Sequence, residues 1–237
     1  MKTKIATALL TACTAMTLAA PALAAPDLAA PGTGGGRVGV KAGDWIIRLR
    51  GIAVIPNERS GGITPTFPNE QLRLDNAVTP EVDISYMVAD NIGIELIAAT
   101  TKHHVFGTSG TTGGIGKLAS TRVLPPTLTV QYHFAPQSKI RPYVGAGINY
   151  SFFFDADASD GLEAAVGRTR VSLSNSFGWA AQAGMDLDLN DRFFLNLDLK
   201  YIDMDSTVTL RTNAIGNQRV RLNIDPIVAG VGVGMRF

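Results

Sequence analysis

The sequence predicts an all-β protein: an eight-stranded antiparallel up-and-down transmembrane β-barrel with short periplasmic turns and long extracellular loops. Three observations support this fold class. Eight stretches alternate between apolar and polar residues, their connections are alternately short and long, and the aromatic residues gather at two levels. No apolar run after residue 25 reaches the roughly 18 to 20 residues that a spanning helix needs, so membrane passage requires a closed barrel.

Residues 1–25 are predicted to be a signal peptide that is removed on export. Two lysines precede an apolar run over residues 5–18, and small residues at 22–24 form a cleavage signature. The only cysteine, Cys13, lies in this segment, so the mature protein is expected to have neither a disulfide nor a thiol nucleophile. The residues before Cys13 also resemble the box of a lipid-modified cysteine, an alternative that the short apolar run before it disfavours.

The mature chain is close to neutral, with 19 basic residues (21 less the two lysines of the signal peptide) and 20 acidic residues. This balance indicates no polyanionic partner, so nucleic-acid binding is not expected. Residues 26–43 are rich in Pro, Gly and Ala and lack periodicity, which predicts a flexible periplasmic N-terminal segment. The barrel is predicted to occupy residues 44–237.

Each predicted strand is an alternating stretch that turn residues separate from the next. In chain order, the strands are predicted at residues 44–56, 79–89, 92–106, 124–134, 140–154, 174–189, 193–210 and 220–237. The short connections are 90–91, 135–139 and 190–192, and the long ones are 57–78, 107–123, 155–173 and 212–219. One helical turn is predicted within the third long loop, at residues 161–167. Short turns at one end and long loops at the other are typical of outer-membrane barrels.

The alternation gives each strand one apolar and one polar face. It is clearest in the fourth, sixth and seventh strands, where the apolar set is Leu128, Val130, Tyr132, Phe134, Ala183, Met185, Leu187, Leu195, Leu197 and Leu199. A soluble barrel would turn this set inward, and the alternation alone leaves that possibility open.

The aromatic residues favour an apolar face turned toward lipid. One group falls beside the short turns: Trp45, Tyr132, Phe134, Phe193 and Phe237. A second group is expected at the opposite level: Tyr86, Tyr150, Phe152, Phe177, Trp179 and Tyr201. Two such belts are typical of two water–lipid interfaces, and ordinary core packing is the alternative. The terminal Phe237 also resembles the signal that the barrel assembly machinery reads, which makes that machinery an expected partner.

The seventh strand is too long to lie wholly in the membrane, because a spanning strand needs only about 9 to 11 residues. Leu195, Leu197 and Leu199 are expected to face lipid. Further along, the apolar residues change parity, so the upper barrel is predicted to be hydrophobic inside and wet outside. The predicted channel lining is Ile52, Val54, Ile202, Met204, Val208, Leu210, Leu222 and Ile224.

Charged and amide side chains share the inward parity in the lower barrel. Eight strands leave an interior barely wide enough for side chains, so these residues are predicted to pair and form a plug. The predicted plug is Arg48, Arg50, Asp83, Glu95, Gln131, Gln182, Asp186, Asp198, Lys200 and Arg236. An apolar solute above such a plug must stop there or leave sideways.

Prolines mark candidate gaps in the barrel wall. Pro125 and Pro126 remove two ladder donors beside the third strand, and Pro226 removes another in the eighth. These three residues are the candidate lateral opening. The alternative for each is a strand end or a bulge without a role in transport.

Several motifs resemble the OmpW family of small outer-membrane proteins. They are Ala42-Gly43-Asp44-Trp45 leading to Arg48 and Arg50, Leu124-Pro125-Pro126-Thr127 followed by residues 131–134, the run from Arg141 to Tyr150, and Asp225-Pro226. The resemblance covers nearly the whole mature chain. It implies an outer-membrane barrel with a hydrophobic channel that admits small hydrophobic molecules and releases them laterally into the membrane. The first long loop and the loop around residues 113–116 match nothing in the family. The resemblance therefore gives no basis for predicting that these loops bind a phage or a toxin.

Other functions have weaker support. His103 and His104 are adjacent on a strand and therefore point to opposite faces, so neither a metal site nor a cofactor is expected. Ser85 and Ser151 could serve a lipid-acting enzyme, but no G-x-S-x-G elbow is present and catalysis is not expected. A structural, adhesive or receptor-type barrel without transport remains the main alternative. The expected partners are outer-membrane lipid and small hydrophobic solutes, and the sequence does not indicate an oligomeric state.

Overall fold

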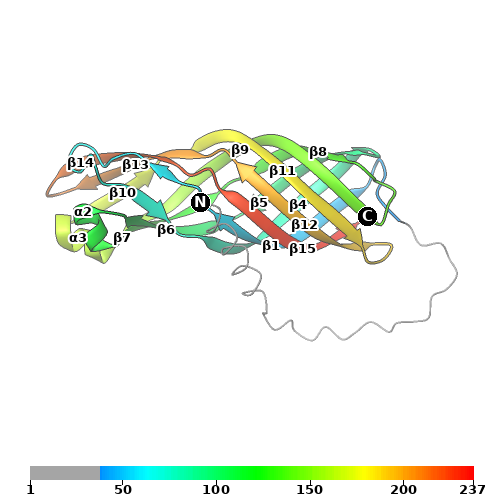
Figure 1. Cartoon of the computed structure of the whole chain (residues 1–237), viewed down its shortest axis with the longest axis horizontal. Coiled ribbons are helices and arrows are strands. Elements are labelled where there is room, and N and C mark those ends of the chain that lie inside the picture. The colour runs from blue at the N-terminus through cyan, green and yellow to red at the C-terminus, as the bar shows by residue number, and fades with distance from the viewer. Residues whose placement is uncertain (1–37) are drawn as a thin grey trace, which may run out of the picture.

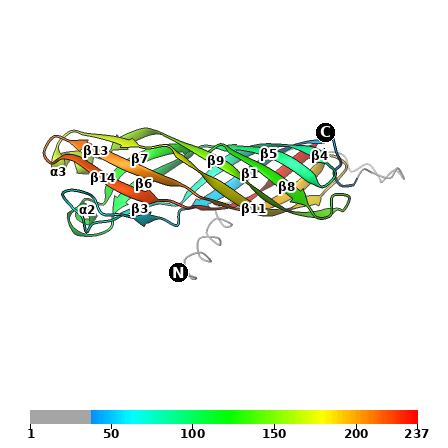
Figure 2. The same ribbon diagram turned by 90° about the horizontal axis from the view of Figure 1, so that it is seen from above.

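The computed structural model describes residues 38–237, which form a long antiparallel β-barrel (Figure 1). We call one end of the barrel the short-turn end, because tight turns connect the strands there. The opposite end, which carries the helices and the β13–β14 hairpin, is the long-loop end (Figure 2). The helices of the described residues are all too short and too polar to cross a membrane.

Eight strands form a closed ring next to the short-turn end. Their order around the ring is β11-β12-β15-β1-β4-β5-β8-β9, and β9 pairs with β11 to close it. We call this ring the closed barrel. Its strands are β1 (Trp45–Ile55), β4 (Ala77–Ala89), β5 (Ile92–Ala99), β8 (Thr127–His133), β9 (Ile140–Ala158), β11 (Ser176–Asp188), β12 (Phe193–Ile202) and β15 (Ile227–Arg236).

The wall continues beyond the closed barrel as a second sheet, which we call the upper wall. Its order is β3-β6-β7-β9-β10-β13-β14-β2, so β9 runs through both sheets. The helices α2 (Gly110–Ile115) and α3 (Asp160–Val166) lie in its loops. Its other strands are β2 (Arg59–Ser60), β3 (Leu72–Leu74), β6 (Thr101–Gly107), β7 (Lys117–Leu124), β10 (Thr169–Leu173), β13 (Asp205–Thr212) and β14 (Gly216–Asn223).

The predicted eight-stranded antiparallel barrel is confirmed, but several boundaries differ. Three of the eight predicted strands are broken into two pieces where the chain passes between the closed barrel and the upper wall: 92–106, 193–210 and 220–237. The predicted long loops at 107–123, 155–173 and 212–219 are too long, because β7, β10 and β14 begin inside them. These strands keep the two-residue alternation of buried and exposed side chains, as in β10. They extend the wall outside the apolar band and therefore lack its apolar outer face.

The helical turn predicted at 161–167 is confirmed as α3. Ser159 caps it, because its hydroxyl oxygen accepts a 3.1 Å hydrogen bond from the Leu162 N–H. Gly167 ends it with a φ of 75°, a conformation that favours glycine. The helix α2 was not predicted. Its sequence contains three glycines, and the residue before it, Ser109, makes no side-chain capping bond.

The described part of the N-terminal segment, residues 38–43, lies across the short-turn end. Val40 is 1% exposed and packs in a small apolar cluster with Ile46, Met87 and Phe194. Its N–H donates a 2.7 Å hydrogen bond to the carbonyl of Pro136. A flexible segment was predicted over 26–43, yet residues 38–43 pack against the short-turn end of the barrel. Residues 26–37 and the predicted signal peptide lie outside the described residues.

Candidate functional site

The outward-facing side chains of the closed barrel form an exposed apolar band. Leu195, Leu197 and Leu199 are 40%, 45% and 50% exposed, as the alternation predicts. Residues such as Leu49 and Val233 continue the band on neighbouring strands. A continuous exposed apolar band on the outside of a barrel indicates that this surface is in contact with lipid.

Aromatic pairs border the band at two levels. Near the short-turn end, the ring centroids of Trp45 and Tyr86 lie 4.9 Å apart. At the opposite border, those of Trp179 and Tyr201 lie 5.1 Å apart. The prediction that placed Tyr86 at the far level is wrong. Tyr86 pairs with Trp45 in the register of β1 and β4, just before the turn at residues 90–91.

Inside the closed barrel, charged side chains form a connected network that we call the ion lattice. Arg48 Nη1 lies 3.3 Å from Asp83 and 3.2 Å from Glu95, and its Nη2 lies 3.1 Å from Asp186. All four side chains are fully buried. Contact between buried charges of opposite sign offsets part of their desolvation cost. An eight-stranded barrel has an interior just wide enough for such side chains to fill.

Arg50 and Lys200 continue the ion lattice toward the upper wall. Arg50 Nε lies 2.9 Å from Glu81, and its Nη1 lies 3.5 Å from Asp198. Lys200 Nζ lies 2.8 Å from Glu81 and 3.0 Å from Asp198. These two cations and two carboxylates form the top layer of the lattice.

All ten residues predicted for the plug are buried inside the closed barrel. Arg236 lies at the short-turn end, where it and Arg141 contact Asp188, and Arg141 Nη2 also lies 3.6 Å from Asp186, which links this end to the ion lattice. Gln131 lies outside these ion pairs, and its Oε1, a hydrogen-bond acceptor, lies 3.2 Å from His133 Nε2. Other inward-facing polar residues were not predicted, although their parity could have revealed them: the buried Glu81, Arg141, Tyr143 and Asn196, and the half-buried Asp188.

Above the ion lattice the interior becomes apolar. Ile202, Met204 and Val208 are 5%, 4% and 2% exposed, so the apolar side of this strand does change face between β12 and β13. All eight residues of the predicted channel lining belong to one buried cluster. The cluster also contains residues that sequence analysis left in loops or unassigned: Ile63, Leu72, Val105, Leu118, Val171 and Val220. These side chains pack against one another and leave two cavities among them.

The first cavity, which we call the junction cavity, lies where the ion lattice meets the apolar cluster. Its volume is about 40 Å³. Glu81 and Lys200 form its polar floor. Its other lining residues include Ile52, Val54, Ile97, Ala99, Thr101, His103, Thr121, Val123, Pro125, Thr127, Ile202, Met204, Ile224, Pro226 and Val228.

The second cavity, which we call the mouth pocket, lies at the long-loop end and has a volume of about 250 Å³. Four separate parts of the chain contribute apolar side chains to it. Ile63 and Phe67 come from the first long loop, Ile115 from α2, Leu162 from α3, and Leu210 from β13. The packed apolar cluster separates this pocket from the junction cavity.

The wall of the junction cavity contains a break in the β-ladder. The β5–β8 ladder ends at the pair Ile97 and Thr127, and the β6–β7 ladder begins at Thr101 and Val123. Between them, no backbone hydrogen bond of the described residues joins 98–100 to 124–126. We call this break the seam.

Several polar groups at the seam bond within their own bank. Pro125 and Pro126 have no N–H to donate, and Asn149 Nδ2 donates to their carbonyls at 3.1 and 3.2 Å. On the opposite bank, the Thr100 carbonyl accepts a 2.8 Å bond from Thr79 Oγ1. None of these bonds crosses the seam, so the seam can widen without breaking them.

The other candidate gap, at Pro226, is tied to its neighbours. The Ile202 N–H donates to the Pro226 carbonyl at 3.2 Å, and the Ile224 N–H donates to the Met204 carbonyl at 2.7 Å. On the other side, the Asn57 N–H donates to the Ile224 carbonyl at 3.0 Å. Widening at this point would break all three bonds.

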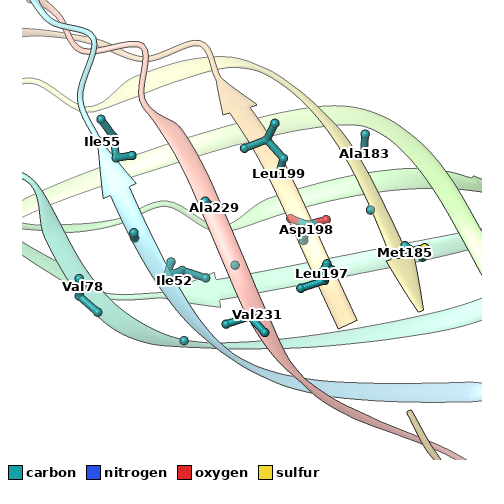
Figure 3. Close-up of a pocket in the computed structure, with 14 residues that line it drawn as sticks. Ile52, Ile55, Val78, Ala183, Met185, Leu197, Asp198, Leu199, Ala229 and Val231 are labelled. Atoms are coloured by element: carbon teal, nitrogen blue, oxygen red, sulfur yellow. The ribbon is translucent and has the colours of Figure 1, made fainter. Parts of the chain in front are cut away.

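A groove of about 380 Å³ crosses the outer face of β1, β15, β12 and β11 (Figure 3). Small residues such as Ala53 and Ala229 form its base, and Leu197 and Leu199 form one side. The ladder behind it is fully paired, with Ala53 opposite Ala229. The groove is therefore a hollow in the lipid-facing surface and not an opening.

The residues considered for metal binding or catalysis make local contacts instead. His103 is buried, and its Nδ1 lies 3.1 Å from the Asp75 carbonyl. His104 is partly exposed and contacts the Asp75 carboxylate at 2.7 Å. Ser85 accepts a hydrogen bond from Arg48, and Ser151 donates one to Asn149. Among residues 38–237, no group of three or more His, Cys, Asp and Glu side chains could hold a metal ion.

The known proteins that resemble this chain in sequence and in structure are outer-membrane proteins. The sequence profile of the OmpW family matches residues 41–237. Outer membrane protein W of Escherichia coli is 37% identical over 83% of this chain and 90% of its own length. Outer membrane protein W of Vibrio cholerae is 36% identical over 82% of this chain and 89% of its own length. The crystal structure of the outer membrane protein OprG from Pseudomonas aeruginosa superposes with a TM-score of 0.79 at 32% identity, covering 84% of this chain and 98% of that one.

Proposed function

The chain belongs to the OmpW family of outer-membrane proteins, and from this premise we propose that it passively admits small hydrophobic molecules and releases them sideways into the membrane. It is located in the bacterial outer membrane, as its relatives are. The short-turn end faces the periplasm and the long-loop end faces outward.

The route begins at the mouth pocket, where apolar side chains from the first long loop, α2, α3 and β13 meet at the extracellular end. It continues through the apolar cluster to the junction cavity. Passage requires the packed side chains of the cluster to move apart as the solute enters. Desolvation of an apolar solute favours each step, at about 25 cal/mol for each Å² of apolar surface removed from water.

The route ends sideways because the ion lattice blocks it below. Moving an apolar solute through that layer would separate buried ion pairs such as Arg48 and Asp186. Breaking one such pair costs about 3–5 kcal/mol, because it leaves an uncompensated buried charge. The seam offers a lower barrier, since no backbone hydrogen bond crosses it in the described residues.

The absence of ladder bonds across the seam is the observation that carries this proposal. It distinguishes Pro125 and Pro126 from Pro226, whose surroundings are bonded on both sides. We therefore assign the lateral exit to the seam and give Pro226 a structural role.

Biogenesis supplies a further expected partner. Phe237 is exposed at the end of the final strand, and its N–H donates a 2.9 Å bond to the Trp45 carbonyl. An aromatic residue at this place is available to the barrel assembly machinery before the barrel closes. Outer-membrane lipid then covers the apolar band.

The proposal is tested by restoring N–H donors at the seam with Pro125→Thr/Pro126→Thr. The new donors allow the ladder to continue between β5 and β8 and close the exit. We expect cells that make this variant to take up a small hydrophobic dye, whose fluorescence rises in lipid, at nearly the rate of cells without the protein. The matched control Pro80→Thr, at an outward-facing position of β4 that lines neither cavity, should keep the wild-type rate.

Folding of each variant is checked by the heat-dependent shift of the barrel in gel electrophoresis. A folded Pro125→Thr/Pro126→Thr barrel with undiminished uptake would contradict the seam as the exit. Equal uptake with and without the wild-type protein would instead favour a structural, adhesive or receptor-type barrel.

A further inference from the structure

We infer that the solutes of this route are uncharged amphiphiles, with an apolar tail and a hydroxyl or carbonyl head, rather than plain hydrocarbons. The head is bound in the junction cavity. This inference rests on the proposed function, because it names the class of solute that the same route takes.

The floor of the junction cavity offers a hydrogen-bond donor. Lys200 is 2% exposed, and its ammonium group contacts Glu81 at 2.8 Å and Asp198 at 3.0 Å. An ammonium group has three N–H donors, and residues 38–237 supply acceptors for two of them. An oxygen on a solute head can accept the third.

The wall on the side of the seam is also polar. Thr101, Thr121 and Thr127 line the junction cavity there, together with His103. Thr101 Oγ1 lies 3.0 Å from His103 Nε2, so these two groups can exchange their mutual bond for one to a solute. The opposite wall is aliphatic, which gives the cavity one polar and one apolar side.

A plain hydrocarbon gains nothing from these groups. Its passage past the hydroxyls and the ammonium group would leave them without solvent and without new partners, which costs free energy. A hydroxyl or carbonyl head exchanges hydrogen bonds with the same groups as it moves from the floor to the seam. The polar side of the cavity thus favours a solute that carries one head.

The charges of the floor decide that the head is neutral. Arg50 lies 2.9 Å from Glu81, 2.7 Å from Asp83 and 3.5 Å from Asp198, and Lys200 contacts Glu81 and Asp198, so both cations already have carboxylate partners. A carboxylate head would add a negative charge beside these carboxylates, and an amine head would have to compete with Lys200 for them, each with a high desolvation cost. A neutral oxygen accepts from Lys200 without separating any of these pairs.

The size of the junction cavity fits a head and not a tail. A cavity needs about 10–15 Å³ to hold one water molecule. The volume of the junction cavity, about 40 Å³, therefore holds a head of a few heavy atoms. The tail then lies among the aliphatic side chains above, including Ile202 and Met204. This arrangement orients the solute with its head toward the ion lattice.

Photolabelling of the protein in lipid nanodiscs tests the inference. The probes are decane, 1-decanol and decanoate, each carrying a diazirine at the second carbon. Mass spectrometry measures labelling of the segment 121–127 relative to the lipid-facing segment 195–199, which corrects for partition into lipid. We expect 1-decanol to label 121–127 about tenfold more than decane or decanoate, as a hydrogen bond to a charged group predicts.

The variant Glu81→Gln/Lys200→Met removes the charged floor, while the new amide can still hydrogen-bond Arg50. We expect it to lower 1-decanol labelling to the level of decane and to leave decane unchanged. The control Glu58→Gln/Lys139→Met makes the same chemical changes outside the junction cavity, at one half-buried and one exposed position, and should behave as wild type.

The wild-type ratios alone decide the inference if the floor variant fails to fold. Equal labelling by 1-decanol and decane would overturn the preference for a head, and equal labelling by decanoate would overturn its neutrality, with the proposed route intact in both cases. No labelling of 121–127 by any probe would overturn the route and the inference together.

Discussion

At the scale of single residues, Asp188 connects three distant parts of the chain at the periplasmic end. It pairs with Arg236 at 2.8 Å, contacts Arg141, and accepts a 3.0 Å bond from the Gly39 N–H. The two arginine side chains are fully buried. One carboxylate thereby connects an arginine of the last strand, an arginine at the start of β9 and a backbone N–H of the N-terminal segment.

Replacing this carboxylate tests its role. Asp188→Asn removes the carboxylate that both buried guanidinium groups contact, and we expect it to lower the free energy of unfolding by about 3–5 kcal/mol. Urea unfolding of the barrel in liposomes measures the change. Asp191→Asn, at an exposed position in the adjacent turn, should have little effect. Equal unfolding midpoints for wild type and Asp188→Asn would contradict the account.

Parity predicted most of the buried polar residues, because a strand exposes alternate side chains to one environment. It therefore identified Arg48, Asp83 and Asp186 as inward-facing. It could not predict Val40, an isolated apolar residue in a segment rich in glycine. The partners that bury Val40, such as Phe194, are distant in sequence, and only the closed barrel brings them together.

At the scale of elements, α2 depends on a residue outside its own sequence. Thr111 and Thr112 donate their backbone N–H groups to the Glu70 carboxylate at 2.9 and 2.8 Å. The Thr112 hydroxyl donates to it as well. Glu70 thus caps the helix from the first long loop. A helix with three glycines and a remote cap gives no signal in its local sequence.

These bonds make the α2 cap sensitive to acid. The hydroxyl and backbone donors of Thr112 lower the pKa of Glu70 below its usual 4.5. Because the folded pKa is the lower one, the cap is at full strength above pH 4.5 and is lost as the pH falls through the folded pKa.

Carbon NMR of the Glu70 carboxyl group measures this effect. We expect a midpoint below 4.5 in the wild type and a shift back toward 4.5 in Thr112→Val, which removes the hydroxyl donor and keeps the side-chain shape. The same midpoint in both proteins would show that the hydroxyl does not contribute.

The strand breaks were only partly predictable. The prolines at 125–126 and 226 indicated weak points in the ladder, and the strands are interrupted at both places, between β7 and β8 and between β14 and β15. The sequence does not reveal which of them is bonded across, because that depends on donors such as Asn149 and Asn57 in neighbouring strands. The seam became identifiable only from the register of four strands.

At the scale of the whole molecule, the barrel consists of two parts with opposite facing. The closed barrel is polar inside and apolar outside, and the upper wall is apolar inside. The sequence predicted this reversal from one strand, because Leu199 and Ile202 lie on opposite faces only three residues apart. The packing of the interior into two separate cavities was not predictable, since it depends on loops that fold over the mouth.

The junction of the two parts determines where a solute can go. The ion lattice lies below it, the apolar cluster lies above it, and the seam lies beside it. Under the proposed function, a solute that reaches this level leaves through the seam or does not leave toward the membrane at all.

Reversible closure of the seam tests this claim most directly. Cysteines replace Ala99 and Pro125, which both line the junction cavity and lie on opposite banks of the seam. The mature chain has no other cysteine if Cys13 is removed with the signal peptide. A short cleavable linker joins the two thiols. Ala53→Cys/Ala229→Cys, on a fully paired part of the ladder, is the matched control. We predict that linking Ala99→Cys/Pro125→Cys abolishes dye uptake, that cleaving the linker restores it, and that the control keeps its uptake throughout. Full uptake by the linked Ala99→Cys/Pro125→Cys barrel would contradict the account.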